Sequence, residues 1–246
     1  MDFLDAYIIR ARLFPAILAI SPFIALIAVT VSWDTLSLPQ VITTVAVGVL
    51  FFAFADLARR MGKRTEKNIF KATGGIPSNT LLMRSDKTFD PTTQERYRKF
   101  VSELIGERAP TAKQEAQDPA AARAYYIRAD NWLRENTRDH GQFKLLFEEN
   151  VTYGFRRNLY GIKWAALALN LAVLMACGVI LYLDKFSADT LKQVAMIGAF
   201  AAVHALYFFF VVTLRSVVAA SDQYARQLIL SSETLAKKPV MSKEKS

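Results

Sequence analysis

Four long apolar stretches, grouped in two pairs, dominate the pattern of hydrophobic and polar positions along the chain. The first pair is expected at about residues 13–33 and 41–57, and the second at about 161–183 and 194–214. About twenty apolar residues in a helix, at about 1.5 Å each, match a hydrocarbon core about 30 Å thick. Because the turn inside each pair is short, the pattern predicts two transmembrane helical hairpins.

A long polar region separates the two hairpins. The chain therefore divides into an N-terminal hairpin (1–58), a central domain (59–160), a C-terminal hairpin (161–215) and a tail (216–246) that is polar after Gln223. This division predicts an all-α integral membrane protein, with two hairpins flanking a mainly helical domain outside the membrane.

Apolar residues recur every three or four positions over three parts of the central domain, which is typical of helices. These helices are expected at about 92–105, with Thr92 or Thr93 as the N-cap, from Pro119 to about Arg138, and at 142–157. The glycine-rich and proline-rich segment 73–91 is expected to be irregular.

The charge is unevenly distributed. The chain carries a net charge of +9 and a pI near 9.7, although 52% of its residues are hydrophobic and the mean hydropathy is +0.18. A basic domain suits an anionic partner, such as lipid head groups, nucleic acid or nucleotides. The alternative is topological, because loops that stay in the cytoplasm are basic in most membrane proteins.

The same charges predict the orientation in the membrane. Between Arg59 and Lys163 lie 21 of the 31 lysines and arginines, whereas the two hairpin loops contain only Lys185 and Lys192. Since positive loops remain inside, the central domain and both termini are expected in the cytoplasm.

Catalytic and metal-binding patterns are not found. The one cysteine, Cys177, cannot form an intramolecular disulfide, and the two histidines, His140 and His204, provide no metal-ligand spacing. There is no phosphate-binding loop ending in Lys-Ser/Thr and no nucleophile elbow. We expect a protein that is not an enzyme and needs no cofactor; a lipid-directed enzyme would have only Asp56, beside two arginines, as a hint.

The segment 74–99 holds the densest cluster of candidate binding residues. A turn at Gly74-Gly75, with arginines nearby, would cradle phosphates, and Tyr97 would offer a ring for a base to stack on. The alternative is that the arginines pair with neighbouring acids and Tyr97 packs in the core. The candidate ligand-binding residues here are Arg84, Arg96, Tyr97, Arg98 and Lys99.

A second cluster lies on the helix that follows Pro119. Arg128 and Trp132 belong to a stretch in which aromatic rings alternate with arginines, as in proteins that bind single-stranded nucleic acid. Aromatic residues at helical spacing are also typical of a packed core, so both interpretations remain open.

Three residues inside the predicted spans are candidates for a role in a pore or its gating. Pro22 should bend the first span and leave the carbonyl of Leu18 without its helical donor. Asn170 and His204 are polar side chains in apolar spans, where unpaired polar groups are costly. They would serve in gating, or they would hydrogen-bond between helices and hold the spans together.

The plan of hairpin, cytoplasmic helical domain and hairpin resembles the four-transmembrane effectors of bacterial anti-phage nucleotide-signalling systems. The segment GGIPSNTLLMRSDKTFDPTTQERYRKF, residues 74–100, is similar to the effector channel of Hailong-type defence.

The resemblance implies a homo-oligomeric channel in the bacterial inner membrane, and we expect a tetramer. A partner nucleotidyltransferase would make a single-stranded DNA oligomer that holds the channel shut, and its removal during phage infection would depolarise the membrane. Arg84, Arg96, Arg98 and Lys99 would then contact phosphates, with Tyr97 and Trp132 as stacking rings. The competing hypothesis is a non-enzymatic membrane anchor that recruits a cytosolic protein.

Overall fold

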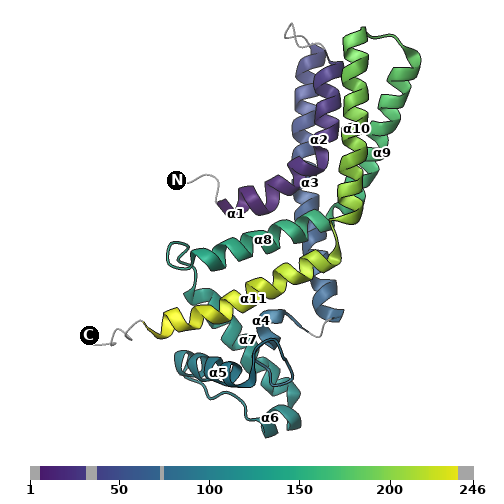
Figure 1. Cartoon of the computed structure of the whole chain (residues 1–246). Helices are drawn as coiled ribbons and strands as arrows, with labels where there is room; N and C mark the ends of the chain where they lie inside the picture. Colours follow the sequence, from purple (N-terminus) through teal and green to yellow (C-terminus); the bar gives the residue numbers. More distant parts are fainter. Residues whose placement is uncertain (1–5, 32–37, 73–74, 238–246) are drawn as a thin grey trace. The chain divides into compact units, whose positions relative to one another are not determined.

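The computed structural model describes residues 6–31, 38–72 and 75–237, and within these residues every regular element is a helix (Figure 1). The chain divides into two compact units. Unit 1 consists of Met1–Lys67 and Val151–Val217, and unit 2 consists of Asn68–Asn150 and Val218–Ser246. The all-α class expected from the sequence is confirmed.

Four helices in the described part of the chain are long and apolar enough to cross a membrane. The first is formed by α1 (Ala6–Ile8), the π-helical segment η1 (Ile9–Leu13) and α2 (Phe14–Thr30). The others are α3 (Leu38–Ala72), α9 (Lys163–Leu183) and α10 (Ala188–Phe210). The chain thus has the helices of a multi-pass membrane protein.

The helix ends differ from the expected spans at several positions: α3 begins at Leu38 and continues to Ala72, α9 begins at Lys163, and α10 ends at Phe210. The first helix begins at Ala6 rather than near residue 13, and the expected end at residue 33 lies outside the described residues. The fourth begins at Ala188 rather than at 194, because the Ser187 side chain accepts a hydrogen bond from the Thr190 backbone N–H at 3.2 Å and caps it.

Helices α2, α9 and α10 pack against one another in unit 1. One buried cluster joins all three: Leu26, Val173, Cys177, Val194, Ile197 and Ala201. A second cluster adds Ala58 of α3 and the end of α8 (Lys144–Gly161): Ala19, Ala58, Leu159, Ile162, Ala166, Phe208 and Val212. These apolar clusters fill the space between the helices.

Aromatic residues mark the two ends of α9. Trp164 is 71% exposed and Tyr182 is 88% exposed. Their separation along the helix is about 27 Å, which is close to the thickness of a hydrocarbon core. Tryptophan and tyrosine favour the two membrane–water interfaces, so this spacing suits a helix that crosses the bilayer.

Unit 2 is built from short helices and from parts of longer ones. It contains α4 (Pro77–Thr80), α5 (Pro91–Ile105), α6 (Ala112–Gln117) and α7 (Pro119–Asn136). The division between the units falls inside three helices: α3, α8 and α11 (Leu214–Ala236). The expected helices near 92–105 and from Pro119 are confirmed, and the third begins at Lys144.

The expected cap of α5 is wrong. Asp90 is the N-cap, since its carboxylate accepts hydrogen bonds from the backbone N–H groups of Thr92 at 3.1 Å and Thr93 at 3.0 Å. Pro91 occupies the first helical position, where its fixed φ starts the helix two residues earlier than the threonines would. Gly106 ends α5 at φ +70, in the left-handed region that glycine tolerates.

The segment expected to be a polar tail is helical up to Ala236, and residues 238–246 lie outside the described part. Ala220, Tyr224, Leu228 and Ile229 of α11 are buried. Ala220, Tyr224 and Leu228 recur every four residues and therefore share one helix face with Ile229, which sequence reasoning overlooked because charged residues surround it. The turn expected at Gly74 also lies outside the described residues.

Candidate functional site

The carbonyl of Leu18 in α2 is bound by His204 of α10. Pro22 lies inside α2 and has no N–H, so the Leu18 carbonyl lacks its usual helical donor. The His204 Nε2 lies 2.9 Å from the Leu18 oxygen, and the Ser21 hydroxyl donates to the same oxygen at 3.0 Å. The carbonyl that the sequence predicts to be free is therefore satisfied by two side chains.

Asn170 of α9 holds the other side of the His204 ring. A carbonyl only accepts, so Nε2 of His204 carries a proton, and in the neutral ring Nδ1 then accepts from Asn170 Nδ2 at 3.0 Å. The same amide donates to the Ala166 carbonyl at 3.0 Å. Asn170 and His204 are 1% and 5% exposed, so this polar cluster is enclosed by three helices.

A second proline in the first helix is compensated in the same way. Pro15 leaves the carbonyl of Ala11 without its helical donor, and Asn158 of α8 donates to that oxygen through Nδ2 at 2.6 Å. Asn158 is fully buried. Sequence reasoning missed this residue, although Pro15 itself signals that a buried donor must approach Ala11.

Lys163, at the start of α9, binds the end of α10. Its ammonium donates to the carbonyls of Phe209 at 2.8 Å and Val212 at 2.9 Å, which have no donor in their own helix. A cation also suits the negative end of the α10 dipole. The buried polar side chains of this region thus act on backbone carbonyls of neighbouring helices.

Helix α8 also contacts α3 closely within unit 1. Arg157 donates to Glu66 at 2.9 Å, and the Tyr153 hydroxyl donates to the other oxygen of that carboxylate at 2.9 Å. Burial, together with the Glu66 charge, raises the pKa of Tyr153. Gly161 and Gly62 let the two backbones meet. These contacts fix α8 against the first hairpin.

The pore and gating candidates Pro22, Asn170 and His204 are therefore brought together. Asn170 and His204 form one hydrogen-bonded cluster with the Leu18 carbonyl of α2, which is the carbonyl that Pro22 leaves without its helical donor. Their part in gating stays a prediction.

In unit 2, Arg84 and Arg98 take part in internal networks. Arg98 is buried and donates to the Leu82 carbonyl at 2.8 Å and to Glu95 at 2.6 Å. Arg84 donates to Glu95 at 3.1 Å and to the Pro110 carbonyl at 3.2 Å. Hydrogen bonding from Arg98 lowers the pKa of Glu95. The expected cluster exists, but its cations hold this segment together.

Residues of the same segment line a cavity of about 550 Å³. Arg84, Lys87 and Arg98 contribute positive charge to it, and Asp86, Asp90 and Glu95 contribute an equal number of carboxylates. The charges of the wall therefore cancel. The cavity is large enough for a small molecule, but it is not selective for an anion.

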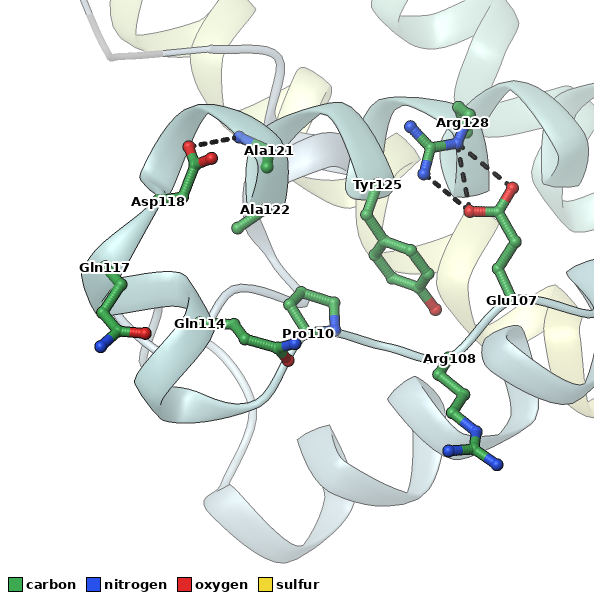
Figure 2. Close-up of a pocket in the computed structure, with 10 residues that line it drawn as sticks. All are labelled: Glu107, Arg108, Pro110, Gln114, Gln117, Asp118, Ala121, Ala122, Tyr125 and Arg128. Atoms are coloured by element: carbon green, nitrogen blue, oxygen red, sulfur yellow. Dashed lines mark hydrogen bonds and ion pairs between the residues drawn. The ribbon is translucent and has the colours of Figure 1, made fainter.

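Arg128 is paired beside a second cavity, of about 360 Å³ (Figure 2). Figure 2 shows its guanidinium turned to Glu107, with nitrogen–oxygen distances of 2.7–3.2 Å. Hydrogen bonding from Arg128 lowers the pKa of Glu107. Glu107 and Asp118 balance Arg108 and Arg128, so this wall is neutral as well.

Arg96 and Tyr97 lie together on α5 and both donate to Glu233 of α11. The Tyr97 hydroxyl is 2.9 Å from Glu233 Oε1, and Arg96 forms an ion pair with the same oxygen. Lys99 is 75% exposed, with Glu103 4.0 Å away, and Trp132 is half-buried on α7. Glu233 was missed because the tail was not expected to fold back on this unit.

The described residues contain no group of three or more histidine, cysteine, aspartate or glutamate side chains that would hold a metal ion. Phosphate contacts and base stacking at the seven candidate binding residues stay predictions: Arg84, Arg96, Tyr97, Arg98, Lys99, Arg128 and Trp132.

In comparisons with known proteins, no family model matches this chain, and neither a curated protein nor a solved structure matches it. The proposals about function therefore rest on the residues and their geometry.

Proposed function

We propose that this chain is the subunit of a homo-oligomeric, ligand-gated channel in the bacterial inner membrane. Its unit 2, on the cytoplasmic side, binds an anionic nucleotide or a single-stranded oligonucleotide, and the bound state sets the tilt of the spans. Opening depolarises the membrane. The observation that carries the proposal is that three helices, α3, α8 and α11, belong to both the spanning unit and the basic unit.

The packing and hydrogen bonds of the membrane-spanning helices support the proposal of a channel. A helix that is interrupted by a proline and held by a hydrogen bond from a neighbouring helix has alternative positions, because exchanging that bond changes its packing. Helix α2, with Pro22 inside it and His204 bonded to its Leu18 carbonyl, is such an element. Since the helices of one chain enclose packed apolar clusters, a water-filled path requires several copies around an axis.

Helix α3 supports an oligomer in the membrane. Only 6% of its apolar window is buried inside the chain, against 22–33% for the other three spans. Its apolar face is covered by lipid and, in the assembly we propose, partly by another copy. A tetramer is the assembly that we propose.

The surface of unit 2 supports the proposal of a nucleotide or oligonucleotide ligand. It presents exposed cations on α5 and α11, among them Arg96, Lys99 and Arg226, next to aromatic rings. Such a surface attracts phosphate backbones, and Phe100, which is half-buried, offers a ring on which a base could stack. The resemblance to Hailong-type effectors adds a role in anti-phage defence, with a nucleotidyltransferase that makes the signal.

Ion flux from liposomes tests the proposal. The purified chain is reconstituted with a trapped ion indicator, with and without a short single-stranded oligonucleotide. We expect flux that changes with the oligonucleotide, and an effect that weakens as salt rises. Arg96→Gln should weaken the response, whereas Arg138→Gln, which removes an exposed arginine paired with Glu135, should not. Absence of flux under all conditions would refute the channel.

The internal ion pairs of unit 2 favour one alternative. Arg84, Arg98 and Arg128 already bind carboxylates, as expected of a domain that is built to hold its shape and recruit a protein. A membrane anchor of this kind would show no flux and no salt-dependent oligonucleotide binding.

A further inference from the structure

The carboxylate of Glu233 occupies a ready-made anion seat on α5. Two donors from adjacent positions, the Tyr97 hydroxyl and the Arg96 guanidinium, converge on the single oxygen Oε1. Hydrogen bonding from Tyr97, with further contributions from Arg96, lowers the pKa of Glu233, so the seat holds a charged carboxylate at neutral pH.

Aromatic rings keep the two donors in place. The Arg96 guanidinium lies 5.6 Å from the centre of the Tyr97 ring and 5.7 Å from that of Phe100. The Tyr97 ring packs on Phe89 at 5.4 Å, and Arg226 of α11 lies 5.6 Å from Phe89. Two arginines therefore flank a pair of packed rings, in the order Arg226, Phe89, Tyr97 and Arg96. A seat whose donors are held in this way binds an anion without first having to be ordered.

The pair is also easy to exchange. Arg96 is 58% exposed and Glu233 is 33% exposed, and ion pairs at such positions contribute little to stability. A phosphate group offers more acceptor oxygens than a carboxylate and forms strong bonds with guanidinium groups. An incoming phosphate can thus replace Glu233 at small cost.

The end of α11 can move without opening the core. Its last deeply buried side chains are Leu228, Ile229, Ser231 and Ser232. Beyond them Glu233 and Leu235 are half-buried, Thr234 and Ala236 are exposed, and the helix ends at Ala236. Losing the Glu233 contacts therefore releases about one turn.

We propose that Arg96 and Tyr97 form a phosphate-binding site for which Glu233 is an internal competitor, so that a phosphate of the ligand displaces Glu233 and frees the last turn of α11. This inference rests on the proposed function, because it assigns a seat and a regulatory contact to the same nucleotide-binding unit. A tethered competitor acts at a high effective concentration, so the contact sets a threshold for binding.

The test measures binding of a fluorescent oligothymidylate to the full chain in detergent. Glu233→Gln removes the competing charge, and we expect roughly tenfold tighter binding. The matched control is Glu135→Gln, which removes another carboxylate of this unit, one that pairs with Arg138 and not with a candidate binding residue. Arg96→Gln should weaken binding in the wild-type and Glu233→Gln backgrounds alike.

Hydrogen exchange of the wild-type chain provides a second readout, independent of any variant. The oligothymidylate should speed exchange in residues 233–236 and leave residues 220–229 unchanged. Polyphosphate, which lacks bases, should produce the same change if the phosphate is what displaces Glu233.

The outcomes separate the two proposals. If the wild type binds the oligothymidylate but Glu233→Gln binds no more tightly than Glu135→Gln, the competitor role is refuted and the proposed function stands. If neither the wild type nor any variant binds, even at low salt, the nucleotide-binding half of the proposed function fails together with this inference.

Discussion

Three buried donors of unit 1 and two exposed arginines of unit 2 make different kinds of contact. In unit 1, Asn158, His204 and Lys163 are buried, and each donates to a backbone carbonyl of another helix that has no helical donor. In unit 2, Arg96 and Arg128 pair with carboxylates and remain more than half exposed. The first kind of group completes the backbone of its neighbours, whereas the second kind is paired only with another side chain.

The two kinds of contact differ in how much stability is lost when one partner is removed. Removing a buried donor leaves a carbonyl without any partner, which costs about 1–3 kcal/mol. Removing one member of an exposed ion pair costs about 0–1 kcal/mol, because water replaces the lost partner. The scaffold of the spans therefore depends on unit 1 contacts that cannot be exchanged, and ligand binding suits the unit 2 contacts that can.

The largest effect is expected where the backbones of α8 and α3 meet. A Cβ atom at Gly161 would lie 2.5 Å from the Gly62 backbone nitrogen and 2.8 Å from the Met61 carbonyl carbon. Neither backbone atom can move aside alone, so Gly161→Ala should destabilise the chain by about 3 kcal/mol. Thermal unfolding in detergent measures the effect.

Gly178→Ala is the matched control for this change. Nothing lies within 4 Å of the added Cβ on α9, and alanine is the better helix former. It should leave the unfolding temperature unchanged or raise it. Equal unfolding temperatures for the two variants would contradict the close approach of α8 and α3.

Removing the donor to Ala11 should have the next largest effect. Asn158→Leu keeps a side chain of similar size but leaves the Ala11 carbonyl unpaired, so a loss of about 2 kcal/mol is expected. Asn136→Leu is the control, since the Asn136 amide is exposed and bonds only to its own helix. If both variants unfold alike, the proline-freed carbonyl at Ala11 does not need Asn158.

Acid should weaken unit 2 through its ion pairs. The pKa values of Glu95, Glu107 and Glu233 are lowered from 4.5 in the folded chain, chiefly by hydrogen bonds from Arg98, Arg128 and Tyr97 respectively. A lowered pKa favours folding above pH 4.5, and this contribution is lost as the pH falls through the folded values. Hydrogen exchange of α5 and α7 should therefore accelerate in that window; constant protection would count against these pairs.

The smallest effect is expected at Asp222, where the sign reverses. Burial, together with repulsion from Asp86, raises the pKa of Asp222 from 3.8. A raised pKa disfavours folding once the group is charged in the unfolded chain, and protonation removes this penalty. Asp222→Asn should slightly raise the unfolding temperature at pH 7, and the gain should vanish below about pH 4.

The sequence predicted those features that depend on nearby residues. The four apolar helices, the helix that starts at Pro119 and the free carbonyl of Leu18 follow from composition or from a nearby proline. The partner of that carbonyl does not, because His204 is 186 positions distant and only packing brings it there. Glu233 and Asn158 were missed for the same reason.

The binding residues were predicted by type and not by environment. The arginines and aromatic rings at 84–99 are equally consistent with a ligand-binding site and with a packed segment. The structure places Arg98 inside and Lys99 outside, although they are neighbours in sequence. Burial of a single arginine depends on which face of α5 meets its neighbours, and composition does not fix that face.

The claim that buried donors of unit 1 complete the backbone of neighbouring helices is tested most directly by a double-mutant cycle on Pro22 and His204. In the wild type, His204→Phe removes the ring donor from Leu18 and the hydrogen bond between Asn170 and His204, at an expected cost of about 2 kcal/mol. Pro22→Ala restores a backbone N–H that can donate to Leu18 from within α2.

If His204 serves the carbonyl that Pro22 frees, its replacement should cost about 1 kcal/mol less in the Pro22→Ala background than in the wild type. Unfolding free energies of the four proteins give this coupling directly. Strictly additive costs would contradict the account, because His204 would then stabilise unit 1 without regard to the free carbonyl.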